Sequence, residues 1–222
     1  MKNPVDNDIK KKETTKAYYD HLSRWYDLLA GQAESKCKDF GLELLNTQPG
    51  ETVLEVGFGT GHCLQSLARS VGKIGKVYGI DLSSGMLQVA QSKLRQKSLA
   101  DKVELRQGDA LQLPYENEFF DALFMSFTLE LFALSEIPIL LKACKRVLSS
   151  QGRMCIVSMS KRDTEGFMIK LYQWAHQQWP TYIDCRPIDA RSEIEQAGFR
   201  VEQPVQLSLF GLPVDIILAR PL

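Results

Sequence analysis

The stretch that decides the fold is Leu54-Glu55-Val56-Gly57-Phe58-Gly59-Thr60-Gly61. Together with Thr52 and Val53 before it, its first residues form a short apolar, β-branched run of the kind found in buried parallel strands. The three alternating glycines predict a tight turn, because glycine adopts backbone conformations that other residues avoid. A helical pattern begins at Gly61, so the stretch predicts a strand, a glycine turn and a helix in succession.

Such a turn can bind a polar ligand, because backbone N–H groups at a helix start can be approached closely where side chains are missing. Alone, it is equally compatible with a plain strand-to-helix turn. Asp81 ends the next strand 20 residues after Gly61, where a carboxylate can bind both hydroxyls of a ribose. Asp109 follows the third strand and can accept a hydrogen bond from the amino group of adenine. The ordinary alternatives are a helix-capping Asp81 and a turn residue at Asp109, but the three features together predict a nucleotide-like cofactor.

Apolar strands and amphipathic helices alternate along most of the chain. The pattern predicts helices over 34–45, 61–70, 84–96, 136–148 and 189–197, and strands over 52–56, 75–80, 102–107, 120–126, 153–159, 201–209 and 214–219. Alternation with short connections predicts an α/β fold, a Rossmann-like doubly wound and mostly parallel seven-stranded sheet with an antiparallel last strand. Ligands bind to such sheets outside the carboxyl ends of the strands.

The chain is expected to hold a mobile tail over 1–12 and a single domain over 13–222. Residues 13–48 predict an N-terminal helical preface that covers the cofactor, with Gly31 as a stop between two helices. Residues 160–188 predict a cap over an acceptor molecule, because they contain a helix that is apolar on more than one side. The alternative is a helix buried against the sheet or in a homodimer.

The composition excludes several classes of protein. Lys plus Arg and Asp plus Glu are 27 each, so the basic footprint of a nucleic-acid-binding protein is absent and we expect no nucleic acid partner. The five cysteines lack the spacing of a metal site, and we expect reduced thiols and no metal. No apolar stretch is long enough for a membrane span, and the polar N-terminus is unlike a signal peptide, so the expected location is cytoplasmic.

The chain resembles the class I S-adenosylmethionine-dependent methyltransferases over about residues 18–159. The residues that carry the resemblance are Leu54 to Gly61, Gly79-Ile80-Asp81-Leu82-Ser83 with Met86, Gly108-Asp109-Ala110 with Leu113-Pro114, Phe119-Phe120-Asp121 and Arg146-Val147-Leu148. Within the class it looks most like the ubiquinone/menaquinone C-methyltransferase and phosphatidylethanolamine N-methyltransferase branch, from Tyr19-Asp20, Tyr26-Asp27 and Gly211-Leu212-Pro213-Val214. One departure is Ser149-Ser150-Gln151-Gly152, where the family has a Pro-Gly turn at the end of the sheet away from the ligand.

The resemblance implies S-adenosylmethionine as cofactor and assigns residues to its parts. The methionine part is expected at Glu55, Gly57, Phe58, Gly59 and Gly61, the ribose at Asp81, the adenine at Leu82, Met86, Asp109 and Ala110, and the methyl group near Ser126 and Phe127. Aromatic faces stabilise a cationic sulfonium, and the candidates are Tyr18, Tyr26 and Phe127, which are equally suited to the core.

A general base is needed only where the acceptor must lose a proton before it attacks the methyl group. Three weak candidates for this catalytic role are Glu130, His21 and His176. Each also has an ordinary alternative: Glu130 as a solvated or capping residue and the two histidines on outer helix surfaces. The catalytic residue therefore stays open.

The sequence predicts methyl transfer to a small apolar or aromatic acceptor that is quinone-like or a lipid. A phospholipid N-methyltransferase is the nearest alternative, and a lipid or quinone acceptor would bring peripheral membrane contact. A nicotinamide-dependent oxidoreductase would show GxGxxG, whereas Gly57, Gly59 and Gly61 follow GxGxG. A non-catalytic cofactor-binding protein is also compatible with the motif, because methyl transfer has no obligatory catalytic side chain.

Overall fold

The computed structural model describes residues 31–161, 187–209 and 211–222. Its helices are α3 (Gly31–Leu45), α4 (His62–Ser70), α5 (Ser84–Gln96), α6 (Ile137–Val147) and α8 (Ala190–Gln196). Its strands are β1 (Thr52–Val56), β2 (Lys76–Asp81), β3 (Val103–Gln107), β4 (Phe120–Ser126), β5 (Leu148–Met159), β6 (Phe199–Leu209) and β7 (Leu212–Pro221). Short 3-10 helices are η1 (Ala100–Lys102), η2 (Ala110–Gln112) and η3 (Leu129–Leu131). No helix in these ranges is long and apolar enough to cross a membrane.

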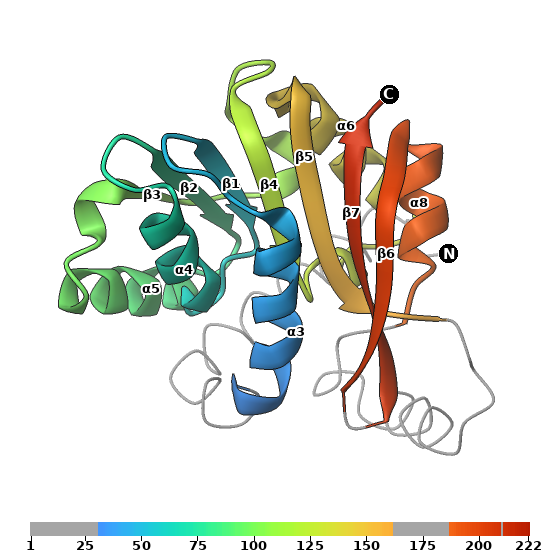
Figure 1. The fold of residues 1–222 in the computed structure, drawn as a ribbon, viewed down its shortest axis with the longest axis horizontal. Helices are drawn as coiled ribbons and strands as arrows, with labels where there is room; N and C mark the ends of the chain where they lie inside the picture. The colour runs from blue at the N-terminus through green and yellow to red at the C-terminus, as the bar shows by residue number, and fades with distance from the viewer. Residues whose placement is uncertain (1–30, 162–186, 210) are drawn as a thin grey trace, which may run out of the picture.

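The strands form one seven-stranded sheet in the order β3-β2-β1-β4-β5-β7-β6 (Figure 1). The pairs from β3 through β5 are parallel, and β7 is antiparallel to both of its neighbours. The predicted fold class, with an antiparallel last strand, is confirmed. Strands β2 and β3 lie on one side of β1, and β4 and the later strands lie on its other side. The direction in which the sheet grows therefore reverses at β1, and sheets of this type bind ligands at such a position.

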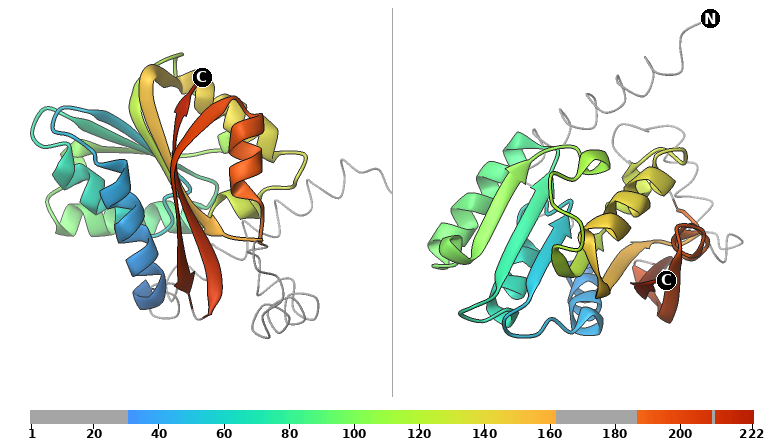
Figure 2. Two further views of the ribbon diagram at one scale, coloured as in Figure 1. Left: turned by 45° about the vertical axis from the view of Figure 1, so that its right-hand side comes forward. Right: turned by 90° about the horizontal axis from the view of Figure 1, so that it is seen from above.

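Helices cover both faces of the sheet (Figure 2). Side chains alternate along each strand, so Phe124 packs on the face covered by α3, α4 and α5, whereas Leu123 and Met125 pack on the face covered by α6 and α8. All three of these side chains are fully buried. A sheet that is buried on both faces explains why β4 is an almost continuous apolar run.

Local signals fix several element boundaries. The predicted helix 84–96 and strand 120–126 agree with α5 and β4. Helix α5 begins where it does because the Ser83 hydroxyl accepts a hydrogen bond from the Met86 N–H at 3.1 Å. Asp189 similarly accepts from the Ser192 N–H at the start of α8.

Two predicted boundaries are wrong. Helix α3 begins at Gly31, earlier than the predicted start at Glu34. Strand β5 begins at Leu148, which pairs with Phe120, and the register then shifts before Arg153 pairs with Ala122. Residues 149–152 therefore belong to an irregular strand start instead of a turn. The predicted tail, the preface before Gly31 and most of the predicted cap lie outside the described residues.

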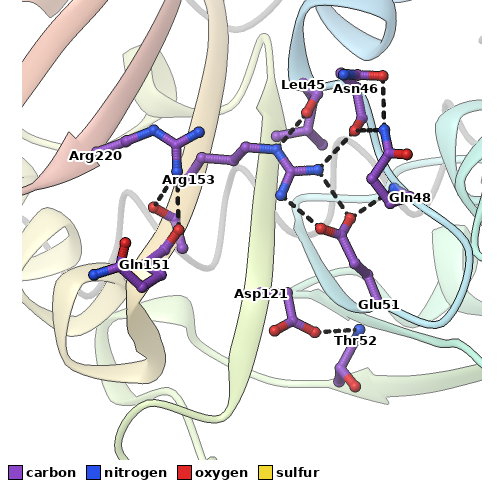
Figure 3. A network of polar contacts seen from close by, with 10 residues as sticks. Leu45, Asn46, Gln48, Glu51, Thr52, Asp121, Gln151, Arg153 and Arg220 are labelled. Atoms are coloured by element: carbon purple, nitrogen blue, oxygen red, sulfur yellow. Dashed lines mark hydrogen bonds and ion pairs between the residues drawn. The ribbon is translucent and has the colours of Figure 1, made fainter.

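A guanidinium group ties the end of α3 to the sheet (Figure 3). Arg153 on β5 donates to the Leu45 carbonyl at 2.6 Å and to the Asn46 carbonyl at 2.8 Å. It also forms a two-pronged pair with Glu51, at 2.7 and 2.8 Å. Bidentate pairs of this kind combine charge with fixed geometry, so Arg153 sets the position of α3 over β4 and β5.

We expect Arg153→Met to lower the free energy of unfolding by about 2 to 4 kcal/mol, because Glu51 and two helix-end carbonyls lose their partner in a half-buried site. Urea unfolding measures this change. The matched control is Arg200→Met at an exposed pair, where a change within about 0.5 kcal/mol is expected. Equal changes in the two variants would contradict the anchoring role.

Candidate functional site

A pocket opens at the carboxyl ends of β1, β2, β3 and β4, with α3 along one side. Predicted site residues that line it are Glu55, Gly57, Phe58, Gly59, Asp81, Leu82, Met86, Asp109, Ala110, Ser126 and Phe127. These residues come from four strand ends that are far apart in the sequence. The parallel sheet brings them to one edge, as the motif positions predicted.

The glycine turn forms one wall of the pocket, and its glycines have different surroundings. Gly57 has a φ of +73°, and a Cβ added to it would collide with the Thr128 side chain. Gly59 has a φ of +52°, and a Cβ added there would meet no atom of the described residues within 4 Å. Since Gly59 lines the pocket, that open space is space available to a ligand. Gly61 is absent from the pocket lining, and its missing side chain lets α4 approach Ala90.

Asp81 and Asp109 both line the pocket and both hold the backbone. The Asp81 carboxylate accepts from the Gly59 N–H at 2.8 Å and the Ser83 N–H at 2.9 Å. Asp109 accepts from the Leu111 N–H at 3.0 Å and caps η2, the ordinary role considered for it. A carboxylate oxygen accepts more than one hydrogen bond, so both can also bind a ligand.

Glu55 lies at the bottom of the pocket and is 1% exposed. Its Oε2 atom is buried and has no hydrogen-bond partner among the residues that the structure describes. Burial raises the pKa of this carboxyl well above its usual value, the Lys38 ammonium lowers it in part, and Asp81 raises it further. A buried carboxyl oxygen without a partner is suited to a cationic or hydrogen-bond-donating ligand group.

Lys38 is a pocket residue that the sequence analysis missed. Its Nζ atom lies 2.7 Å from Glu34 Oε2 on the same helix and 5.7 Å from the centre of the Phe127 ring. The i, i+4 spacing of Glu34 and Lys38 was a visible signal for a helix-surface pair, but their approach to β1 and β4 comes from the packing of α3. Lys38 adds a positive charge on the side of the pocket that faces Glu55.

Ser126 and Phe127 form the wall beyond β4. Phe127 has a φ of +49°, a left-handed conformation that is uncommon for a bulky residue. Its N–H donates to the Val157 carbonyl at 2.7 Å, which holds this conformation against β5. The Ser126 side chain is hydrogen-bonded to the Cys63 thiol, and burial raises the pKa of that thiol. Strained backbone at the end of a central strand is typical of functional sites.

Glu130 lies in η3 and is absent from the pocket lining. It is 1% exposed, so the expectation of a solvated side chain is wrong. Its Oε1 atom accepts from the Met159 N–H at 3.0 Å, whereas Oε2 has no hydrogen-bond partner in residues 31–161, 187–209 and 211–222. Burial raises the pKa of Glu130 to about 7, against two backbone hydrogen bonds that lower it, and nearby Glu34 raises it further.

The remaining candidates are distributed as follows. Tyr18, Tyr26, His21 and His176 lie outside the described residues. Pocket residues that sequence reasoning did not select include Thr60, His62, Cys63, Thr128, Leu131, Phe132, Ala133 and Glu136. Most of them directly follow the glycine turn or Phe127, so proximity to those motifs was the available signal. Among them, Leu131, Phe132 and Ala133 give the pocket an apolar wall beside Phe127.

Comparison with known proteins identifies the family. A methyltransferase domain family matches residues 53–152. The 2-phytyl-1,4-naphtoquinone methyltransferase of Trichormus variabilis is 30% identical over 166 residues, which cover 75% of this chain and 67% of that protein. The chain belongs to the class I S-adenosylmethionine-dependent methyltransferases.

Other members of the family agree in sequence and in structure. The ubiquinone/menaquinone biosynthesis C-methyltransferase UbiE of Teredinibacter turnerae is 33% identical over 145 residues, 65% of this chain and 56% of that protein. The chain thus spans little more than half the length of the first such relatives. A crystal structure of a SAM-dependent methyltransferase from Aquifex aeolicus has a TM-score of 0.64 and 26% identity, over 82% of this chain and 89% of that one. The resemblance stated from the motifs is confirmed.

We expect the two glycines of the methyltransferase motif to respond differently to alanine. Gly57→Ala should lower the free energy of unfolding by about 3 kcal/mol, because alanine is strained in the left-handed backbone conformation and its methyl group would collide with Thr128. Gly59→Ala should cost only about 1 kcal/mol, because its methyl group enters open space, but it should weaken cofactor binding at least about tenfold. Urea unfolding and calorimetric titration measure the two effects. Similar stability losses in both variants would contradict this assignment.

We expect Glu130→Gln to change how stability depends on pH. A carboxyl whose folded pKa is raised from 4.5 to about 7 stabilises the protein at low pH, and this contribution is lost as the pH rises through about 7. The variant keeps an acceptor for the Met159 N–H, so it should gain about 2 to 3 kcal/mol on the wild type between about pH 5 and about pH 8. Urea unfolding at both pH values tests this, with exposed Glu116→Gln as the control that should show no such gain.

Proposed function

We propose that this chain transfers a methyl group from S-adenosylmethionine to a small quinone-like acceptor. The observation that carries the proposal is the pocket at the strand ends, where an open glycine turn, a buried carboxyl oxygen and two further carboxylates meet. The names of the similar proteins support the acceptor class, since they include a naphthoquinone methyltransferase and a ubiquinone/menaquinone C-methyltransferase. Their chemistry is the best available guide to this one.

The two ends of the pocket suit the two ends of the cofactor. Glu55 and Lys38 offer one negative and one positive group, which match the ammonium and carboxylate of a methionine moiety. Gly59 supplies the open space through which that moiety can approach the backbone. A ligand with a free amino-acid group therefore fits this end better than a dinucleotide does.

The other end suits a nucleoside. Asp81 lines the pocket at the end of β2 and would accept hydrogen bonds from the ribose hydroxyls. Leu82 and Met86 would contact the faces of the adenine ring, and Asp109 with Ala110 would contact its amino edge. Since the Asp81 carboxylate already accepts two backbone N–H groups, its orientation toward the pocket is fixed before a ligand binds.

When bound, the cofactor supplies a methyl group activated by the positive charge of its sulfur. A ring carbon of the reduced, quinol form of the acceptor would form the new bond to this methyl, the sulfur would keep the electron pair of the bond that breaks, and the ring proton would pass to water. The protein mainly has to hold the two reactants in line and exclude water, which contributes about 7 to 11 kcal/mol in favourable cases. Leu131 and Phe132 beside Phe127 would provide the apolar wall against which an aromatic ring could lie.

Glu130 is a candidate for a general base that lies in the described part of the chain. The Glu130 carboxyl accepts a hydrogen bond from the Met159 N–H at the end of β5 and does not line the pocket. Contact with the acceptor would therefore need a change in the position of the Glu130 side chain. A cap over 160–188, contributions of Tyr18 and Tyr26, membrane contact and a homodimer remain proposals from the sequence.

Calorimetric titration of the purified chain tests the cofactor. We expect micromolar binding of S-adenosylmethionine and S-adenosylhomocysteine, no binding of NADH, and at least about a hundredfold weaker binding in Asp81→Ala, which removes a carboxylate that serves both the turn and the ribose. The control is Asp101→Ala, which lies at the far end of the sheet. Binding of NADH instead would overturn the assignment.

A methyl-transfer assay tests the acceptor class. Radiolabelled S-adenosylmethionine would be incubated with a demethylated menaquinol, a small phenol and phosphatidylethanolamine vesicles. We expect labelled product from the quinol. Labelling of the amino phospholipid alone would replace the quinone-like acceptor with a lipid amine, and cofactor binding without transfer to any acceptor would favour a non-catalytic binding protein.

A further inference from the structure

Glu55 differs from the other carboxylates of the pocket because no hydrogen bond from the described part of the chain reaches its buried Oε2 atom. Asp81 and Asp109 each accept backbone N–H groups, and Glu136 accepts from the Ala133 N–H. Glu55 is nearly inaccessible to solvent but forms part of the pocket surface. Its Oε2 atom is therefore shielded from bulk solvent and has no donor within the described ranges.

The groups around Glu55 come from each element packed against it. Lys38 faces it from α3, Asp81 from β2 and Cys63 from α4. Lys38 is a partial counter-charge, since its ammonium also pairs with Glu34 at 2.7 Å. Asp81 adds a like charge, and the Cys63 thiol is hydrogen-bonded to Ser126. Burial and Asp81 together outweigh Lys38, so the pKa of Glu55 stays well above the usual value for glutamate.

We propose that Glu55 carries a proton while the pocket is empty and releases it to solvent when the α-ammonium group of the cofactor binds beside it. Binding of the cofactor is then coupled to the release of one proton. No covalent bond changes: the carboxylic acid becomes a carboxylate, and the ligand's ammonium becomes its counter-ion. This inference rests on the proposed function, because it takes a ligand with an amino-acid group as the occupant of the pocket.

The reason lies in the change of surroundings that a cation brings. A buried carboxylate without a partner is disfavoured, so the neutral acid predominates in the empty pocket. An ammonium group at Oε2 supplies both a positive charge and a hydrogen-bond donor, and each favours the ionised carboxyl. Affinity should therefore rise with pH, by up to about tenfold per pH unit while the empty pocket holds the proton.

Proton release can be counted by calorimetry of S-adenosylhomocysteine binding in two buffers that differ in ionisation enthalpy. We expect release of a substantial fraction of one proton by the wild type near neutral pH, and a loss of most of this release in Glu55→Gln. The ligand's own ammonium group titrates with both proteins and cancels in this difference. Glu43→Gln on the exposed side of α3 is the matched control and should release as many protons as the wild type.

A second ligand tests whether proton release depends on the amino-acid part of the cofactor. 5′-Methylthioadenosine lacks the amino-acid part, so it should bind without proton release from Glu55. Equal release with both ligands, or equal release by wild type and Glu55→Gln, would overturn the inference while leaving the cofactor assignment intact. No binding of S-adenosylhomocysteine by the wild type would overturn both.

Infrared spectroscopy provides a measurement that does not depend on the folding of Glu55→Gln. On addition of S-adenosylhomocysteine, the difference spectrum of the wild type should lose a protonated carboxylic acid band and gain a carboxylate band. 5′-Methylthioadenosine should leave the acid band in place. An empty pocket without a protonated acid band, or one that keeps this band with S-adenosylhomocysteine bound, would contradict the proposal.

Discussion

The hydrogen bond from the Gly59 N–H to the Asp81 carboxylate, at 2.8 Å, is the contact on which the pocket depends. It joins the turn after β1 to the end of β2, and the Gly57 N–H reinforces it by donating to the Ile80 carbonyl. The same carboxylate then lines the pocket, so one side chain sets both the shape of the turn and the place of a ligand hydroxyl. A change at Asp81 would therefore alter geometry and recognition together.

Charge is distributed unevenly around this contact. Glu55 and Lys38 lie at one end of the pocket, Asp109 lies on the wall after β3, and the wall after β4 carries Phe127 and Phe132. From β3 to β4 the residues that follow the strands thus change from carboxylates to an aromatic side chain, with the Lys38 ammonium beside Phe127. This arrangement suits a ligand whose polar parts are fixed first and whose reactive part faces a hydrophobic neighbour.

Local sequence signals predicted those parts of the molecule whose structure is determined locally. The predicted bounds of α5 and β4 agree with the structure, in which Ser83 caps the helix and the strand is a nearly continuous apolar run. Lys38 was missed because only the packing of α3 on the sheet brings this residue to the pocket beside β1. The start of β5 was missed because it depends on the pairing of Leu148 with Phe120, which is not visible in the local sequence. The inward position of Glu130 likewise depends on an N–H of Met159 that lies 29 residues away.

The contacts of Arg153 have a consequence for how the chain folds. This residue joins β5 to partners that precede it by 102 to 108 positions. During synthesis from the N-terminus, α3 emerges early, but its hydrogen bonds with Arg153 form only after β5 has also left the ribosome. The wall that carries Lys38 is therefore completed after the β1 turn and the β2 end have met, and closing so long a loop makes it a late step in folding.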